Sequence, residues 1–340
     1  MRATLVFIWG NYKPHLVMVM TKLCLAVSSI LLQSVLSTGI SALVVVVYEH
    51  MISACVLSAL AFFFEKGTRP PFSFQILCYS FFLGFLLITV FQMLRTLSLQ
   101  YVEATYQSVA LNLMAAIVFV LALIFGQEDL QFCTIRGQAK MWGVGLSAAG
   151  ALTMVLWAGP TLFESAFTAS KSSSIIGESM LVVSILAGAS WNLLVGLMSK
   201  KYPAIISLSA MMCFFGTIQA GIITIFLVTV SSWKLKWEGG LVLIAILWEG
   251  IMGAGLSYYA HVWCVHTRGP VFAAAFQPLL IVYTFILEAT VLREATHLGR
   301  VIGAVLVVLG LYMLLWGKAK DTERQGLSET DESINSPLLD

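Results

Sequence analysis

Uncharged apolar runs long enough to cross a lipid bilayer recur along the whole of this 340-residue chain. About twenty such residues in a row span a bilayer as a helix. Only 11% of the residues are charged and 59% are hydrophobic, whereas about a quarter of the residues of a soluble domain are charged. The sequence therefore predicts an all-α membrane protein. Hydropathy places ten transmembrane helices near residues 15–36, 41–64, 72–94, 104–125, 141–158, 178–198, 205–230, 240–263, 269–290 and 299–316.

A segment rich in serine and threonine divides these spans into two sets of five. Because five is odd, the second set must enter the membrane from the opposite side to the first, which predicts two inverted repeats. We expect a first five-helix repeat at 15–158, a polar linker at 159–177 and a second five-helix repeat at 178–317. The charged segment 318–340 is predicted to be a disordered cytoplasmic tail.

Glycines give weak support to the repeat. Gly143 and Gly150 lie in the fifth span, and Gly303 and Gly310 lie in the tenth at the same spacing. Small residues on one face of a helix allow close packing against a neighbour in lipid. We interpret these four glycines as packing residues.

Lysine and arginine predict the orientation. When both termini are placed in the cytoplasm, the cytoplasmic loops receive about twice as many of these residues as the outer loops, as the positive-inside rule requires. We therefore expect a multi-pass protein with both termini cytoplasmic. The sequence leaves open whether it lies in the plasma membrane or the vacuolar membrane.

Two apolar segments carry an amide at corresponding places in the two halves. Tyr101–Glu128 contains Asn112, and Arg268–Glu294 contains Gln277 beside the helix-breaking Pro278. Polar residues are costly in hydrocarbon, and those found there tend to be functional. Interrupted spans in matching positions also indicate where a transporter binds its solute. We therefore expect Asn112, Gln277 and Pro278 to form part of a binding site at mid-membrane.

Other polar and aromatic residues at similar depth are further candidates for solute binding. They are Gln92, Trp191, Asn192, Gln219, Tyr258 and Tyr259. Amides supply donors and acceptors without the cost of a buried charge, which suits zwitterionic or weak-acid solutes. For each of them, a hydrogen bond between helices with no role in binding is an equal alternative.

Glu49 and Glu249 are candidates for proton coupling, because each lies two to three turns inside a span. Lys22 is a candidate partner for one of them, although it lies toward the opposite face of the membrane from Glu49. A purely structural ion pair is the equal alternative. We place His261 and His266 at the cytoplasmic interface.

Several function classes are excluded by their missing motifs. The chain lacks HExxH, G-x-S-x-G and Walker sequences, and no aspartate lies between Asp129 and Asp321, so we predict that it is not an enzyme. Its cysteines are scattered without metal-ligand spacing, and we expect no metal and no cofactor. The net charge of +2 gives no reason to expect a nucleic-acid partner. The expected partners are a small-molecule solute and the lipid bilayer, and a homodimer is left open.

Short motifs in order along both halves resemble the plant nodulin-like, walls-are-thin-related transporters, which are EamA-type members of the drug/metabolite transporter superfamily. The matching motifs are Val47–His50, Ala104–Ser108, Lys201–Ala204, Cys213–Gln219 and Gly269–Phe272. The resemblance implies a fold of ten helices in two inverted repeats. It also implies facilitated or secondary movement of amino acids, auxin or related metabolites.

Six positions depart from the pattern of that family. Lys22 stands in place of a glutamine, Gln33 in place of a lysine, Glu49 in place of a basic residue and Met114 in place of a proline. Val195 and Leu197 replace a glutamine and a lysine. These changes affect charge and helix breaks. They motivate an alternative function, that of a family member that does not transport and acts as a membrane receptor or regulatory partner.

Overall fold

All regular secondary structure that the computed structural model describes is helical. It describes residues 2–36, 38–67, 69–71, 73–98, 101, 104–128, 134–157, 175–233, 240–287, 290 and 298–335. Residues 159–174, which make up most of the predicted linker, lie outside these described residues.

The helices of the amino-terminal part lead to that linker. They are α1 (Arg2–Leu36), α2 (Ala42–Glu65), α3 (Phe74–Gly84), the π-helix η1 (Phe85–Gln92), α4 (Met93–Ser98), α5 (Ala104–Ile124) and α6 (Ile135–Leu156). The helices of the carboxy-terminal part follow it. They are α7 (Ile175–Lys201), α8 (Ile205–Leu227), the short 3₁₀ helix η2 (Val230–Trp233), α9 (Leu241–Trp248), the π-helix η3 (Glu249–Leu256), α10 (Ser257–Arg268), α11 (Pro270–Ala275), α12 (Gln277–Leu287) and α13 (Leu298–Asn335).

Within the described residues, eight helical segments are long and apolar enough to span a membrane, so the chain is a multi-pass integral membrane protein. They are Tyr12–Leu36, Ala42–Glu65, Phe74–Ser98, Ile175–Lys201, Ile205–Leu227, Val242–Arg268, Pro270–Leu287 and Val301–Lys318. Each overlaps one of the spans expected from hydropathy.

The two remaining predicted spans, 104–125 and 141–158, are helical but are not among those eight. They correspond to α5 and α6. The apolar part of α5 is the stretch Leu113–Ile124, which is shorter than the eight membrane-spanning segments. Helix α6 is less apolar, since its first turns carry Arg136 and Lys140 and much of the rest is glycine, alanine and serine. The arrangement of ten spans in two repeats therefore stays a prediction.

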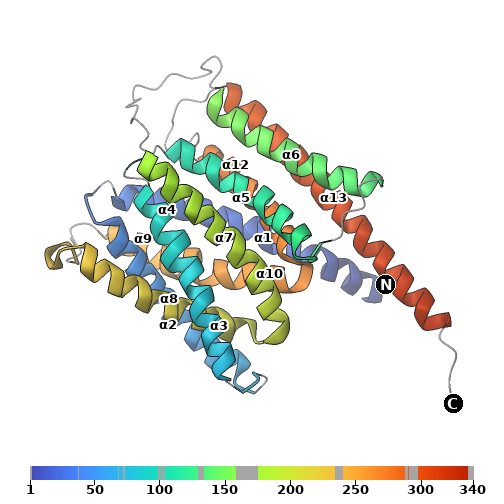
Figure 1. Cartoon of the computed structure of the whole chain (residues 1–340), viewed down its shortest axis with the longest axis horizontal. Coiled ribbons are helices and arrows are strands. Elements are labelled where there is room, and N and C mark those ends of the chain that lie inside the picture. The colour runs from blue at the N-terminus through green and yellow to red at the C-terminus, as the bar shows by residue number, and fades with distance from the viewer. Residues whose placement is uncertain are drawn as a thin grey trace.

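Helices α6 and α13 lie side by side along one edge of the bundle (Figure 1). Glycines allow this pairing. A Cβ at Gly143 would lie 2.6 Å from the backbone nitrogen of Leu314, and one at Gly150 would lie 2.8 Å from the carbonyl oxygen of Gly303. The two backbones are therefore closer than any larger residue at these positions would permit. The interpretation of these glycines as packing residues agrees with this geometry.

The tail differs from the expectation of disorder at 318–340. Helix α13 runs on to Asn335 and extends beyond the bundle toward the carboxy terminus (Figure 1). The segment is rich in lysine, glutamate, glutamine and arginine, which are good helix formers, so the last span continues into it without a break. Residues 336–340 lie outside the described residues.

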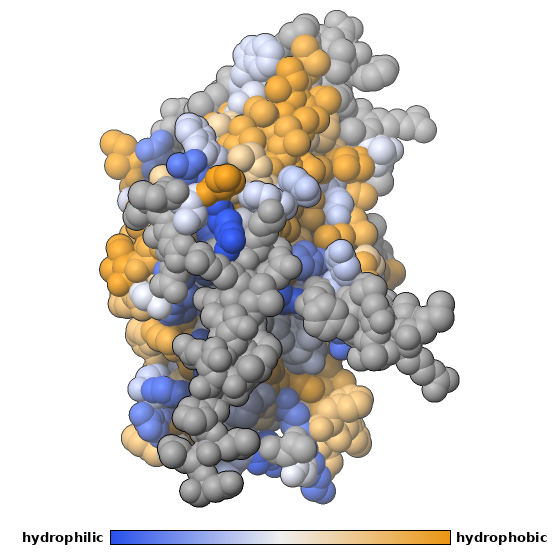
Figure 2. Space-filling model, turned by 90° about the vertical axis from the view of Figure 1, so that its right-hand side faces the viewer, coloured by the Kyte–Doolittle hydropathy of each residue, from blue (hydrophilic) through white to orange (hydrophobic). Residues whose placement is uncertain are grey.

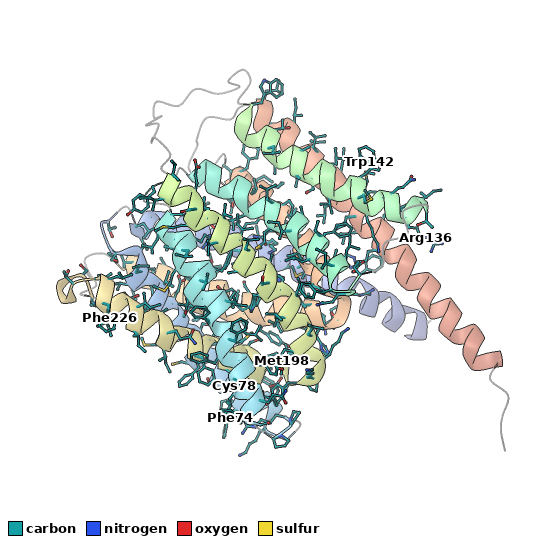
Figure 3. All side chains as sticks on the ribbon, viewed as in Figure 1. Phe74, Cys78, Arg136, Trp142, Met198 and Phe226 are labelled. Atoms are coloured by element: carbon teal, nitrogen blue, oxygen red, sulfur yellow. The ribbon has the colours of Figure 1, made fainter. Side chains whose placement is uncertain are left out.

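The outer surface of the bundle carries many large apolar side chains, as a lipid-facing surface requires. Phe226 is 85% exposed and Trp142 is 69% exposed, and both lie at the outer edges of the helices in Figure 3. Figure 2 shows broad apolar patches on one such face. The apolar interior is continuous from α1 to α13.

Two of the long helical segments contain a π-helical stretch of eight residues near their middle. The stretch η1 lies between α3 and α4, and η3 lies between α9 and α10. η1 packs on α7 and α8, whereas η3 packs on α1 and α2. π-Helical turns are rare and occur often at functional sites. Both stretches carry a predicted site residue at one end, Gln92 in η1 and Glu249 in η3.

The segment that follows Arg268 is broken, as its sequence predicts. Gly269 has a φ of 87°, a backbone conformation that favours glycine, and Pro270 begins α11. Helix α11 ends at Ala275, and α12 begins at Gln277. Pro278 has no N–H to continue the hydrogen-bond ladder of α11, so the break falls at the expected residues.

Candidate functional site

Glu49 and His50 form the centre of a buried acidic cluster on α2. The Glu49 side chain is 1% exposed and that of His50 is fully buried. His50 Nδ1 lies 3.2 Å from Glu49 Oε1 and 2.8 Å from the carbonyl oxygen of Val46. Gln92 Nε2, on η1, donates to the same Glu49 oxygen at 3.4 Å. The acidic cluster therefore joins α2 to η1 through polar contacts in the apolar interior.

Tyr258 on α10 adds a fourth group to the acidic cluster. His50 Nε2 lies 3.3 Å from its hydroxyl oxygen, and the two rings lie 5.8 Å apart. With its proton on Nδ1, His50 donates to the Val46 carbonyl and accepts from Tyr258. One imidazole thus links a helix of the amino-terminal part of the chain to a helix of the carboxy-terminal part.

Glu249 faces the acidic cluster from η3, which meets α2 through glycines. A Cβ at Gly250 would lie 2.9 Å from the carbonyl oxygen of Glu49. A Cβ at Gly253 would lie 2.6 Å from Glu249 Oε2, so the Glu249 carboxylate occupies the space over that glycine. Glu49 and Glu249 therefore belong to two elements, α2 and η3, that pack closely on each other.

A second group of polar residues, the basic cluster, lies where α1, α7, α10 and α12 meet. Lys22 on α1 is 2% exposed, and its Nζ donates to Gln277 Oε1 at 2.7 Å. His261 on α10 lies 2.6 Å, through Nε2, from Asn192 Oδ1 on α7. The His261 ring stacks on Trp191 with a centroid distance of 5.2 Å.

Aromatic rings connect the two clusters. Trp191 lies 6.4 Å from Tyr258 and stacks on His261. Tyr258 in turn contacts His50. A continuous path of rings thus leads from the acidic cluster to the basic cluster. Such rings provide apolar contact area with polar edges, which suits an organic solute.

Several buried polar atoms in these clusters have no hydrogen-bond partner among the described residues. They are Glu49 Oε2, Glu249 Oε2 and Trp191 Nε1. Buried polar groups are nearly always hydrogen-bonded, so unpartnered groups need an explanation such as a water or a bound molecule. Three in one neighbourhood make this the best candidate for a binding site.

The structure separates some predicted site residues from the two clusters. Gln219 on α8 accepts from Thr89 at 3.1 Å and donates to the carbonyl of Phe81 at 3.2 Å. These contacts are hydrogen bonds between helices. They correspond to the alternative to solute binding that the sequence leaves open for each polar candidate. Tyr259 is half-buried against the apolar core. The side chain of Asn112 on α5 lies outside the described residues.

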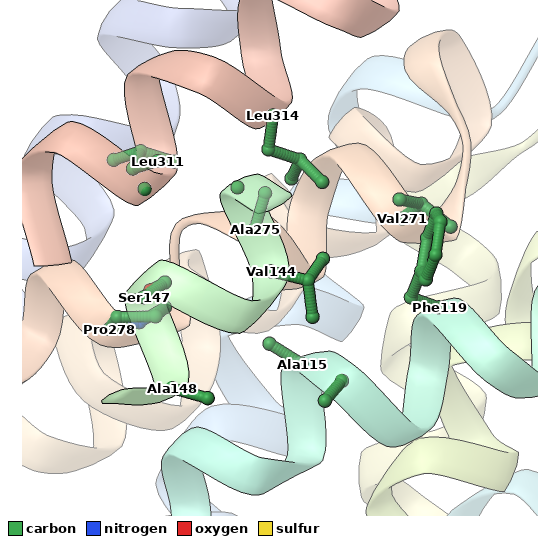
Figure 4. A pocket seen from close by; sticks show the side chains of 13 residues that line it. Ala115, Phe119, Val144, Ser147, Ala148, Val271, Ala275, Pro278, Leu311 and Leu314 are labelled. Carbon is green, nitrogen blue, oxygen red and sulfur yellow. The ribbon is translucent and has the colours of Figure 1, made fainter. Parts of the chain in front are cut away.

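Pro278 lines a different feature, a small cavity between α5, α6, α11, α12 and α13 (Figure 4). Its volume is about 20 Å³, and most of its walls are apolar, with Phe119, Val271 and Leu314 among them. A cavity of this size holds about one water molecule. It is too small to bind an organic solute.

Two residues gain importance only from the structure. His50 and His261 take part in the clusters, although His261 was expected at the cytoplasmic interface. Lys22 pairs with Gln277 and not with either candidate glutamate. Hydropathy gives the depth of a residue in the membrane but not the direction in which it faces. The sequence therefore does not indicate which residues these side chains contact.

A further buried contact joins α2 to the start of α8. Glu65, the last residue of α2, accepts from the backbone N–H groups of Ile206 and Ser207 at 2.9 and 2.7 Å, and from the Ser207 hydroxyl at 2.7 Å. Helix α8 has no capping side chain of its own at Ala204, so Glu65 satisfies its first donors. Burial raises the pKa of the neighbouring Tyr202, and the negative charge of Glu65 adds to this effect.

Comparisons with known proteins give similar sequences over nearly the whole chain. WAT1-related protein At5g07050 of Arabidopsis thaliana is 35% identical over 331 residues, which cover 92% of this chain and 82% of that relative. WAT1-related protein At2g37460 of the same plant is 32% identical, with 96% and 89% covered. WAT1-related protein At1g21890 is also 32% identical, with 97% and 90% covered.

No protein-family model matches the chain. A solved structure, described only as the crystal structure of a protein, superposes with a TM-score of 0.70 over 89% of this chain and 98% of that one. Its sequence identity is 13%, so this likeness shows a shared fold and nothing about activity.

Proposed function

Since the chain belongs to the family of WAT1-related plant membrane proteins, we propose that it is a secondary or facilitative transporter of small organic solutes. The observation that carries this proposal is the pair of linked polar clusters in the bundle interior. They draw residues from helices on both sides of the predicted linker and contain buried polar atoms without partners. A membrane protein that served only as an anchor would have no use for such costly groups.

The helix contacts support an arrangement in two inverted five-helix repeats. If each helix of the first five corresponds to one of the second five, the contacts of η1 with α7 and α8 correspond to those of η3 with α1 and α2. The contact of α5 with α7 corresponds in the same way to that of α12 with α1. Helices α6 and α13, which would be counterparts, pack on each other, as do α2 and α8. Pairs exchanged in this way are expected about a pseudo-twofold axis.

In the proposed mechanism the two halves rock against each other around the clusters and expose them to each side of the membrane in turn. Gln92, Trp191, Tyr258 and Gln277 hold the solute, with Asn112 in the corresponding place on α5. Glu49 and Glu249 bind and release a proton as the halves move. The break at Pro278 frees a backbone carbonyl to contact the solute. Amino acids, auxin and related metabolites are the proposed solutes.

Both termini are proposed to lie in the cytoplasm, on the basis of the distribution of lysine and arginine. The membrane is proposed to be the plasma membrane or the vacuolar membrane of a plant cell. Accessibility of a single cysteine added at either terminus, labelled in intact and in permeabilised cells, tests the orientation. Labelling before permeabilisation would contradict it.

The function is tested by uptake of labelled amino acids and auxin into liposomes that contain the purified protein. The assay is run with and without an inwardly directed proton gradient. For a proton-coupled carrier we expect the gradient to drive accumulation, and Glu49→Gln or Glu249→Gln to reduce uptake to simple equilibration. The control is Glu178→Gln, because Glu178 is an exposed carboxylate at the start of α7.

Other outcomes lead to different conclusions. Uptake that equilibrates equally with and without the gradient indicates a facilitator, in which Glu49 and Glu249 have a packing role. No flux of any solute through folded protein would overturn the proposed function. It would favour the alternative of a receptor or regulatory partner, which the departures at Lys22, Glu49 and Met114 motivate.

A further inference from the structure

Lys22 differs in its partner from Lys140, which is equally buried, and from the partly buried Lys318. Lys140 and Lys318 both bind the carboxylate of Glu128, at 3.0 and 2.6 Å. Lys22 is as deeply buried as Lys140, at 2% exposure, but its Nζ donates to the neutral amide oxygen of Gln277 at 2.7 Å. No carboxylate of the described residues lies within ion-pair distance of it. Its positive charge therefore has no counter-charge among the residues that the structure describes.

A buried ammonium group without an anionic partner is costly, and more so within a membrane. An amide oxygen accepts a hydrogen bond but does not neutralise the charge. Removal of one partner of a buried ion pair leaves the other charge buried and uncompensated, which strongly destabilises the fold. Buried charges are therefore normally found with a partner. A mobile partner that arrives from solution would remove the cost while it is bound.

The neighbours of Lys22 point to the chemistry of that partner. Lys22 has two further N–H donors, and the indole N–H of Trp191, 4% exposed as a residue, has no acceptor among the described residues. Trp191 stacks on His261, and α10, which carries His261, packs on α1, which carries Lys22. The unused groups here are donors. A carboxylate, which only accepts hydrogen bonds, is their natural complement.

We infer that Lys22 is a specificity-determining residue that makes this transporter select solutes with a net negative charge on a carboxylate over their uncharged amides. This inference rests on the proposed function. The solute carboxylate replaces Gln277 Oε1 on the Lys22 ammonium. Its organic part lies against the rings of Trp191 and His261. The acidic cluster lies beyond the Trp191–Tyr258 contact.

The test compares solutes that have the same shape and differ in charge. Labelled indole-3-acetate and indole-3-acetamide, phenylacetate and phenylacetamide, and benzoate and benzamide are taken up by liposomes with the same pH on both sides, and uptake by protein-free liposomes is subtracted. For the unaltered protein we expect the acid of a transported pair to enter faster than its amide. Lys22→Gln, which introduces the residue of the family pattern, should lower the acid-to-amide ratio by about tenfold or more, the scale of one lost charge-assisted hydrogen bond. Lys22→Arg should keep most of the ratio.

A second variant acts without removing the lysine. Gln277→Glu gives Lys22 an internal carboxylate at the position of the present amide oxygen. We expect it to lower the acid-to-amide ratio because the internal carboxylate competes with that of the solute. It should also leave the thermal stability of the purified protein unchanged or higher. A lower ratio in stable protein separates loss of selectivity from loss of folding.

Each remaining outcome decides the question. An unaltered protein that prefers the amides, or an unchanged ratio in folded Lys22→Gln protein, overturns the inference and leaves the proposed function standing. Transport of other solutes of the panel, with no uptake of any of the three acids, does the same. No transport of any solute overturns the proposed function and with it the inference.

Discussion

The α6–α13 pair and the two polar clusters are both buried regions, but they are built on opposite principles. Between α6 and α13, glycines bring the backbones together, and Glu128 binds lysines from both helices. Each charge in that contact has a partner. In the clusters, a lysine has only an amide, and carboxylate and indole atoms have no partner among the described residues.

The difference indicates which region serves stability and which serves function. In the α6–α13 contact the lysines are paired with a carboxylate, although the Ser147 hydroxyl has no partner among the described residues, and the close packing resists change. Groups left unsatisfied cost folding free energy, and proteins retain them mainly at sites that act on another molecule. Substitutions should therefore affect folding in the first region and transport in the second.

The largest effect is expected at Gly143. A methyl group there would lie 2.6 Å from the backbone nitrogen of Leu314, so Gly143→Ala must push α6 and α13 apart and should lower the free energy of unfolding by about 1–3 kcal/mol. Gly145 on the same helix is the matched control, because a Cβ there meets nothing within 4 Å. Gly145→Ala should be neutral or stabilise the helix by up to about 1 kcal/mol. Thermal unfolding of purified protein measures both, and equal effects would contradict the close contact.

A smaller effect is expected at Glu65, which joins α2 to α8 through satisfied polar contacts. Glu65→Gln keeps the shape and removes the charge that stabilises the start of α8, at a cost of about 1 kcal/mol. Ser207→Ala removes one of the three hydrogen bonds and should cost less. The same unfolding measurement orders the two variants. A larger loss in Ser207→Ala than in Glu65→Gln would disagree with the assignment of Glu65 as the cap.

The smallest effect is expected at Gln219, which sharpens the contrast with Gln92. Both are amides inside a span, but Gln219 bonds Thr89 and Phe81, whereas Gln92 bonds Glu49. Gln219→Leu should cost about 0.6 kcal/mol of stability, the average for a hydrogen bond between membrane helices, and should leave uptake unchanged. Gln92→Leu should reduce uptake in protein that is still folded. Impaired uptake in folded Gln219→Leu protein would contradict the assignment of a structural role to Gln219 and a transport role to Gln92.

Much of the fold could be predicted because hydropathy responds directly to burial in lipid. The eight spans, the broken helix at Gln277 and Pro278, and the glycine positions in α6 and α13 were all visible in the sequence. The extent of α13 was not, because hydropathy detects where the membrane ends but not where a helix ends. The π-helical stretches also leave no clear periodic signal in runs that are almost uniformly apolar.

The candidate site residues were chosen by their place within a span, which does not give their partners. Glu49, Gln92, Trp191 and Tyr258 are linked through contacts in the structure, and their roles in binding stay predictions. Lys22 and His261 did not take the predicted places, because their partners come from helices far away in the chain and depend on how each helix is rotated. That rotation is set by packing, which the sequence alone does not specify.

The π-helical stretches bear on how lengths vary among related chains. A helix wound in part with i→i+5 hydrogen bonds holds more residues in each turn than an α-helix does. Loss or gain of one residue within 85–92 or 249–256 can therefore be absorbed by tighter or wider winding, without displacing either end of the span. For a relative that differs in length here, an alignment that moved the gap into a loop would assign the wrong facing residues between the two places. Single-residue gaps in the middle of these two membrane segments are compatible with an unchanged fold.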